Sequence, residues 1–334
     1  MVRLRGAAEK RLRDTPGAPW GLHQPVGAMR PAGDYSGRLP QEAAMASFVL
    51  YDHDYSRAVD QGTLQPENFD HCFLCEGDSW MDRSSLAQLS LPWALASRFR
   101  GPRGDRALFI NLSQFGHTLR RISDCLDDTL HQWLTTSLGL RFDALLFSAG
   151  GNDFIDAALI PPPGEGILAN VRGRDPARRR PGECAEAGAV AALVAGIDED
   201  FRRLYDAVRA SPLHGDMPIL LNSYNAPVAR DAPAIRGRKA WLAEAYRKNG
   251  IPPHLWDEVT ERIFIDVKFT VTGWLEEDGR EGLVVVPTDQ VPLVPAQADA
   301  TGNSGDWLNE IHPNVSGWEK LADAWQRELD DVLA

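Results

Sequence analysis

Short apolar runs alternate with longer amphipathic stretches from about residue 70 to the end of the chain. Each run holds four to six apolar residues, which is typical of strands that are buried on both faces. The stretches between the runs have helical periodicity, so the pattern predicts strand–helix–strand units and a parallel sheet. The five predicted strands are HCFLCE (71–76), RALFINL (106–112), FDALLFSA (142–149), MPILLNSY (217–224) and EGLVVVPT (281–288).

The clearest predicted helix is the stretch NVSGWEKLADAWQRELDDVL at residues 314–333. Its apolar side chains recur every three or four residues and fall on one helical face, which should pack against the core. Ser316 and Glu319 have the spacing of a capping box, which predicts a helix start near Gly317. The apolar positions are Trp318, Leu321, Ala322, Trp325, Leu329 and Val332.

The other stretches define the predicted domain organisation. Residues 1–45 are rich in Arg, Gly and Pro and have little periodicity, so we interpret them as a flexible preamble. Residues 46–69 should pack on the core of a single domain that spans 70–334. Two insertions are expected on the rim of the sheet. One, at about 160–185, is basic and rich in Pro and Gly, and the other, at about 225–280, contains helical segments.

Charge and hydropathy exclude several classes of partner. The net charge of −12 argues against nucleic acid or an anionic membrane surface as the main partner, because both need a basic face. No run of about 18 apolar residues exists, so no membrane span is expected. The N-terminal stretch has basic residues but no apolar signal-peptide core, so a cytoplasmic location is the default expectation. The oligomeric state is not predicted by any of these features.

The cysteines and histidines do not indicate a metal centre. Four cysteines in 334 residues are too few for a disulfide framework. Cys72 and Cys75 lie in a predicted strand, where residues three apart point to opposite faces, so core packing is favoured over a metal or redox role. His53 and His71 have no third ligand at helical spacing. We therefore expect neither a metal nor another cofactor.

Polar residues follow the ends of the predicted strands. The first strand ends in GDS (77–79), the second is followed by NLSQFGHT with Gly116, and the third by GGND (150–153) with Asn152. The stretch DWLNEIHPN, directly before the last helix, carries His312. Ligands of open parallel sheets bind outside the carboxyl ends of the strands. We therefore expect a hydroxyl, a glycine amide, a side-chain amide and an imidazole to meet at one edge.

These groups are the ones that acyl transfer requires. A serine hydroxyl is a weak nucleophile and needs a neighbouring base, so Ser79 is the candidate nucleophile and His312 the candidate base. A tetrahedral intermediate needs hydrogen-bond donors, which the backbone N–H groups of Ser79 and Gly116 and the Asn152 amide would supply. The acids beside these residues, Asp78 and Asp153, are expected to brace their loops by hydrogen bonds.

The blocks GDSW, NLSQFGHT, GGND and DWLNEIHPN, in this order, resemble the SGNH (GDSL) hydrolases. That family is named for the Ser, Gly, Asn and His of four short blocks, and the resemblance covers roughly residues 70–334. It implies a flavodoxin-like three-layer α/β/α domain with a five-stranded parallel sheet. It also implies hydrolysis of esters or related acyl bonds without a metal. Carried over to this chain, it implies Ser79 as nucleophile, His312 as general base, and Gly116 and Asn152 as oxyanion donors.

The chain departs from the family pattern at one position. The family usually has an aspartate three residues before the histidine, whereas this chain has Asn309. An asparagine can hold the ring by a hydrogen bond but cannot balance the imidazolium charge. We expect Asp306 to take the acid role, because the flexible TGNSGDW loop lets its backbone adjust, with Glu310 as the second choice. A Ser–His dyad helped by a backbone carbonyl is a third arrangement.

The sequence thus predicts a serine esterase that acts on a small-molecule ester, with both insertions shaping the substrate pocket. Short acyl esters, acetylated sugars, lipids and thioesters all fit the pattern. The alternative is a catalytically inactive module of the same fold that binds a carbohydrate or acylated ligand, which Asn309 would favour. A nucleotide-binding flavodoxin-like protein is disfavoured, because neither G-x-G-x-x-G nor G-x-x-x-x-G-K-[ST] follows a predicted strand.

Overall fold

The computed structural model describes residues 47–82, 89–101, 104–124, 129–136, 140–173, 175, 180–235, 237–276 and 280–334. The predicted preamble at 1–45 and Cys125 lie outside the described residues.

A parallel sheet of six strands, in the order β1-β3-β2-β4-β5-β6, organises the described chain. The five predicted strands are confirmed as β2 to β6; β2 to β5 are almost wholly buried because helices cover both faces, and the edge strand β6 is mostly half-buried. The sixth strand, β1, was not predicted and pairs with β3 at the edge, with Phe48 opposite Leu108. The strands are β1 (Phe48–Tyr51), β2 (His71–Gly77), β3 (Ala107–Asn111), β4 (Ala144–Ser148), β5 (Ile219–Asn222) and β6 (Leu283–Val286).

Apart from β1, the strand order is the flavodoxin-like one. The chain runs from β2 outward to β3 and then returns past β2 to form β4 on its other side. The direction of winding therefore reverses between β2 and β4. In sheets of this kind the ligand crevice opens at the carboxyl ends of the two strands that flank the reversal.

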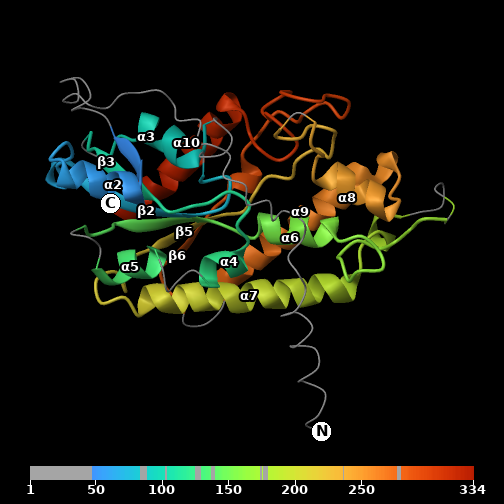
Figure 1. Cartoon of the computed structure of the whole chain (residues 1–334), viewed down its shortest axis with the longest axis horizontal. Helices are drawn as coiled ribbons and strands as arrows, with labels where there is room; N and C mark the ends of the chain where they lie inside the picture. Colours follow the sequence, from blue (N-terminus) through green and yellow to red (C-terminus); the bar gives the residue numbers. More distant parts are fainter. Residues whose placement is uncertain are drawn as a thin grey trace, which may run out of the picture. The chain divides into compact units, whose positions relative to one another are not determined.

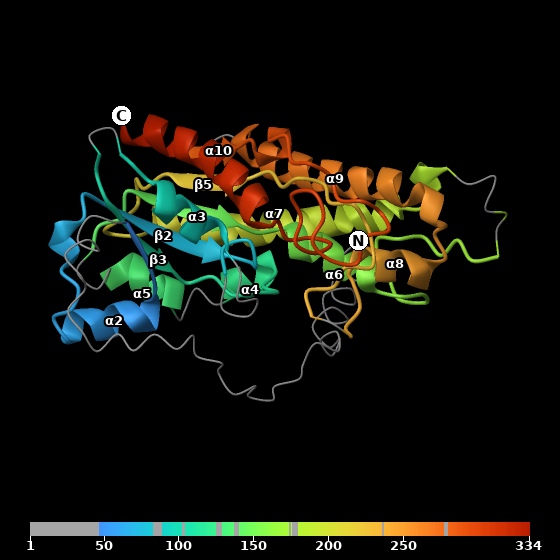
Figure 2. The ribbon, with the colours of Figure 1, turned by 90° about the horizontal axis from the view of Figure 1, so that it is seen from above.

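Helices cover both faces of the sheet, with α3 and α10 on one side and α4, α5 and α7 on the other (Figure 1). Helices α6, α8 and α9 gather toward the end of the sheet to which the strands point (Figure 2). Among the described residues, no helix is long and apolar enough to cross a membrane. The helices are α2 (Asp52–Asp60), α3 (Leu91–Arg98), α4 (Leu119–Asp124), α5 (Thr129–Thr136), α6 (Gly151–Leu159), α7 (Ala187–Arg209), α8 (Leu242–Asn249), α9 (Trp256–Glu276) and α10 (Val315–Leu333).

Helix α10 has the predicted apolar face but a different start. The predicted positions from Trp318 to Leu329 are buried, and Val332 is half-buried. The predicted start near Gly317 and the Ser316 cap are wrong. The N-cap is Asn314, whose side chain accepts a hydrogen bond from the Gly317 N–H, at 3.0 Å. The Ser316 hydroxyl instead hydrogen-bonds Asp306.

The two predicted insertions have different structures. The second insertion, 225–280, contains the whole of α8 and α9, and both helices contact α6 near the carboxyl end of the sheet. The described part of the first, 160–185, contains an antiparallel bridge between Leu168 and Ala185. Several of its apolar side chains, among them Leu168 and Val171, are buried, so part of this segment packs on the core in spite of its polar composition.

Candidate active site

A close approach of two strands explains the glycine that ends β2. Gly77 lies opposite Ser148 of β4, and a Cβ atom at Gly77 would come within 2.2 Å of the Ser148 carbonyl oxygen. Its φ of 147° is also unfavourable for other residues. Directly after it, the Asp78 N–H donates to the same carbonyl, at 2.9 Å. The chain then turns, and Ser79 lies just beyond the carboxyl end of the central strand.

Asp78 braces the turn that carries Ser79. Its Oδ1 accepts hydrogen bonds from the Trp80 N–H (2.9 Å) and the Ser148 hydroxyl (3.1 Å). Its Oδ2 accepts from the Tyr224 hydroxyl, at 2.6 Å. Burial raises the pKa of Asp78 to about 6, although these hydrogen bonds lower it. The predicted bracing role is confirmed, and it ties the Ser79 turn to β4 and to the segment after β5.

Ser79 and His312, although 233 residues apart, are in direct contact. The Ser79 Oγ lies 2.8 Å from Nε2 of His312, and both side chains are buried. The Trp80 indole N–H donates to the Ile311 carbonyl at 3.2 Å, which fastens the Ser79 turn to the loop before α10. As expected from the positions of the strand ends, the two residues meet at one edge of the sheet.

Asn309 occupies the other side of the His312 ring and determines which nitrogen carries the proton. The Asn309 Oδ1 lies 2.9 Å from the His312 Nδ1 and accepts from two backbone N–H groups, those of Ile311 and His312. Because those donors require an oxygen, the orientation of the amide is fixed, and Nδ1 must be the protonated nitrogen. Nε2 is then the acceptor for the Ser79 hydroxyl, which is the tautomer that a general base needs.

The imidazole of His312 lies in an uncharged environment. It is 2% exposed, and its ring packs edge-on to Trp241, with centroids 5.6 Å apart. Burial lowers the pKa of His312 to about 4. The ring is therefore neutral at pH 7 and able to accept a proton.

The carboxylate of Asp306 binds other groups than the His312 ring, so the structure does not support its predicted role as the acid of the triad. The Asp306 Oδ2 accepts from the Lys320 ammonium (2.5 Å) and the Val294 N–H (2.6 Å). Burial would raise the pKa of Asp306, but these bonds and the Ser316 hydroxyl outweigh it and hold the pKa below the usual value. Its carboxylate thus joins the loop to α10.

Glu310, the second choice for the acid, points away to helix α8. Its carboxylate accepts hydrogen bonds from the N–H groups of Arg230, Trp241, Leu242 and Ala243, the last two in the first turn of the helix. Burial raises the pKa of Glu310 to about 7, against the lowering effect of these four donors. Glu310 therefore caps α8 and holds the histidine loop against it.

The predicted oxyanion donors follow two strands of the sheet, Gly116 in the turn after β3 and Asn152 in the first turn of α6, after β4. Gly116 has a φ of 72° in the turn after β3, a conformation that favours glycine. The Asn152 side-chain amide donates one N–H to the His117 carbonyl, at 3.0 Å, and keeps a second N–H. The backbone N–H groups of Ser79 and Gly116 donate to no acceptor among the described residues. Asp153 braces this region as predicted, accepting from the Leu119 N–H at 2.9 Å.

Comparisons with known proteins give structural likeness only. No family model and no curated protein matches the chain. The chain is similar to a solved lipase from a goat rumen metagenome, with 13% identity over 77% of this chain and 96% of that one, at a TM-score of 0.47. It is also similar to an extracellular lipase of Streptomyces rimosus, with 12% identity over 78% of this chain and 99% of that one, at a TM-score of 0.44. An acetylxylan esterase of Geobacillus stearothermophilus has 14% identity over 78% of this chain and 94% of its own, at a TM-score of 0.39. Function is therefore argued from the site geometry.

A small pocket opens beside Ser79. Asn152 lines it together with Trp80, Ile155 of α6 and Phe264 of α9. The second predicted insertion therefore contributes a wall through Phe264, as expected of a segment that shapes the pocket.

Three residues of the site were not among the site residues predicted from the sequence. Tyr224, with a φ of 51°, supports Asp78 from the segment after β5, and Trp80 packs against its ring at 4.8 Å. Phe264 is one of several apolar residues on α9. A search of the two residues that follow each strand could have found Tyr224, which is the second residue past β5.

Within the described residues, no group of three or more His, Cys, Asp or Glu could hold a metal ion. Cys72 and Cys75 are both buried in β2, and burial raises the pKa of the Cys72 thiol to about 12. A thiol of this kind is unreactive at neutral pH.

Proposed function

We propose that the protein is a serine hydrolase that cleaves carboxylic esters, with Ser79 as nucleophile and His312 as general base. One observation carries the proposal, namely the 2.8 Å contact between the Ser79 Oγ and an Nε2 atom whose ring is fixed by Asn309. This is the nucleophile–base–orienting group arrangement of acyl-transfer sites. The order of the four sequence blocks supports the same chemistry.

The reaction would proceed in two halves. The Ser79 Oγ attacks the ester carbonyl carbon as its proton passes to Nε2 of His312, and the carbonyl oxygen becomes an oxyanion. The backbone N–H groups of Ser79 and Gly116 and the free N–H of Asn152 would stabilise that charge. Nε2 then gives its proton to the departing alcohol oxygen. Water then attacks the acyl carbon as Nε2 takes its proton, the bond to the Ser79 Oγ breaks to release the acid, and Nε2 returns the proton to that oxygen.

Asn309 gives this site its particular character. Its amide oxygen holds Nδ1–H and hence the correct tautomer, but it adds no negative charge to stabilise the imidazolium that forms in each half-reaction. The proposed enzyme is therefore expected to be slower than one with a carboxylate at this position. It should also keep its base unprotonated to a lower pH, because the pKa of His312 is about 4.

The test combines turnover with active-site labelling. The wild-type chain should hydrolyse p-nitrophenyl acetate and react with one equivalent of a fluorophosphonate probe. Both activities should disappear in Ser79→Ala and in His312→Ala, while Ser316→Ala, a serine outside the site, should keep them. A folded wild-type chain that neither turns over the ester nor takes up the probe would refute the proposal.

Asn309 also favours a second candidate, an inactive module that binds a carbohydrate or acylated ligand at the same edge of the sheet. In that case the probe would not react, but the folded chain would bind acetylated sugars. Calorimetric titration with an acetylated xylo-oligosaccharide measures binding, and an assay of free acetate in the same sample distinguishes the two candidates. Only the enzyme would release acetate.

A further inference from the structure

The pocket beside Ser79 has a volume that is informative about the substrate. Its free space is about 20 Å³. A single water-sized sphere itself occupies about 10–15 Å³. The pocket is therefore small and has room for a short acyl group rather than for an extended alkyl chain.

The chemistry of ester cleavage determines which half of the substrate enters this pocket. The departing alcohol oxygen must lie near Nε2 of His312, because that nitrogen protonates it. The carbonyl oxygen must lie near the oxyanion donors, and Asn152 is both a predicted donor and a wall of the pocket. The substituent that follows the carbonyl into the pocket is therefore the acyl chain, and the alcohol lies on the His312 side.

The walls that close the pocket are buried side chains from different parts of the chain. Trp80 follows β2, Ile155 lies on α6, and Phe264 lies on α9. All three are less than 9% exposed, so each is packed on other side chains as well as on the pocket. Displacing one of them requires repacking of the core, which is unfavourable in a close-packed interior.

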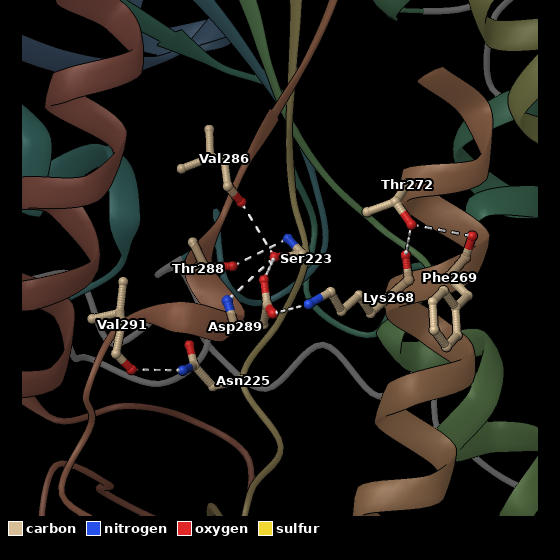
Figure 3. Close-up of polar contacts among 9 residues, drawn as sticks. All are labelled: Ser223, Asn225, Lys268, Phe269, Thr272, Val286, Thr288, Asp289 and Val291. Atoms are coloured by element: carbon tan, nitrogen blue, oxygen red, sulfur yellow. Dashed lines mark hydrogen bonds and ion pairs between the residues drawn. The ribbon is translucent and has the colours of Figure 1, made fainter. Parts of the chain in front are cut away.

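A polar network connects α9 to the segment directly after β5 (Figure 3). Ser223, directly after β5, donates its N–H to the Thr288 hydroxyl at 3.1 Å and contacts the Asp289 carboxylate through its own hydroxyl. Lys268 reaches the same carboxylate from α9, with Nζ 2.5 Å from Oδ2. Lys268 lies one helical turn after Phe264, so the network ties the Phe264 side of the pocket to the end of β5.

The opposite wall is fastened to the same turn. Asn225, which lines the pocket, donates from its side-chain amide to the Val291 carbonyl, at 3.1 Å (Figure 3). Residues 288–291 thus hold the segment after β5 directly and α9 through Lys268 and Asp289. Both parts of the lining are therefore anchored to one turn, which restrains their separate movement.

We propose that this pocket holds the acyl group and restricts the enzyme to esters of short acyl chains, with acetyl preferred. The inference rests on the proposed ester hydrolysis and adds the acyl specificity of the same site. Phe264 and Ile155 are the residues that set the limit on chain length.

The test is the ratio of kcat/KM for p-nitrophenyl butyrate, hexanoate and octanoate to that for the acetate. One extra methylene in a closed apolar pocket changes kcat/KM by about 10–200-fold, so the wild-type ratio for butyrate should be below about 0.1. Phe264→Ala should raise this ratio at least about tenfold, by the same reasoning, and move the preferred chain beyond acetyl. Val267→Ala, a buried truncation on α9 outside the pocket lining, should leave the ratio unchanged.

Two milder variants cover the case in which Phe264→Ala does not fold. Phe264→Leu and Ile155→Val remove less volume and should shift the ratio in the same direction, with thermal melting as the check on folding. A wild-type kcat/KM that rises with chain length would overturn the inference while leaving ester hydrolysis intact. So would pocket variants whose profile matches that of Val267→Ala. Failure of ester hydrolysis itself would be recognised separately, because wild type and Ser79→Ala would then show the same background rate with every ester.

Discussion

Replacing Asn309 by aspartate places a negative charge against the His312 ring without changing the size of the side chain. The Asn309 Oδ1 lies 2.9 Å from Nδ1 and already accepts two backbone N–H groups, so a carboxylate oxygen can take over every contact. The variant therefore tests the charge alone, with the tautomer and ring orientation kept.

The size of the effect follows from the geometry. Two opposite charges about 4 Å apart attract by about 4 kcal/mol at an effective dielectric constant of about 20. That corresponds to about 3 pKa units, at about 1.36 kcal/mol per unit. Adjacent opposite charges commonly shift a pKa by about 1–3 units. The pKa of His312 should therefore rise from about 4 to between about 5 and 7.

The pH dependence of kcat/KM measures this shift, because its acid limb reports the base of the free enzyme. Wild type should hold its activity down to about pH 4, whereas Asn309→Asp should lose activity about 1–3 pH units higher. At pH 8 the variant should be faster by about 10–100-fold, since part of the attraction stabilises the imidazolium in the transition state.

Asn303→Asp is the matched control, because it adds the same charge to an exposed position of the same loop. Its acid limb should coincide with that of wild type. The reasoning is refuted if Asn309→Asp folds normally and its acid limb remains at the wild-type pH.

Three further predictions concern the support of the site. Burial raises the pKa of Glu76 from its usual value of 4.5 to about 8, so the stability that this residue contributes is complete below pH 4.5 and is lost as the pH rises from there through about 8. Relative to wild type, Glu76→Gln should therefore unfold at a clearly higher urea concentration at pH 9 than it does at about pH 4. Equal behaviour at both pH values would contradict this. Gly77→Ala should give little or no soluble protein, because its Cβ would lie 2.2 Å from the Ser148 carbonyl oxygen. A variant with the melting temperature of wild type would show that β2 and β4 can separate at this point. Tyr224→Phe removes a donor from buried Asp78 and should lower the free energy of unfolding by about 1–3 kcal/mol, measured by urea titration; a loss under about 0.5 kcal/mol would mean that Asp78 is braced without it.

The sheet was predictable because its strands are buried on both faces and appear as apolar runs. β1 was missed because its residues, FVLY, were assigned with 46–69 to a segment that packs on the core, and its pairing with β3 is a long-range contact that the apolar run does not reveal. The start of α10 was misplaced because Asn314 and Ser316 are both good caps, and the contact of Ser316 with Asp306 decides between them only in three dimensions.

The site was predictable to the extent that strand ends must meet at one edge. For this reason Ser79 and His312 were expected to meet, but the positions of strand ends do not indicate which polar side chain binds the other nitrogen of the ring. Asn309 binds Nδ1 because the local turn brings its side chain against the ring of His312, three residues later. Asp306 instead forms an ion pair with Lys320 of α10. Phe264 was not predictable because its neighbours on α9 are equally apolar, and only packing decides which one faces the pocket.

The central claim is that the Ser79 hydroxyl forms a covalent acyl intermediate with the help of His312. The most direct measurement is the mass of the intact protein, quenched with acid during the first turnover of p-nitrophenyl acetate and followed by peptide mapping. The account predicts one acetyl group per chain, on the peptide that contains Ser79, and none in Ser79→Ala or His312→Ala. Acetate release by wild type with no acetylated protein at any quench time, or acetylation at a different residue, would contradict it.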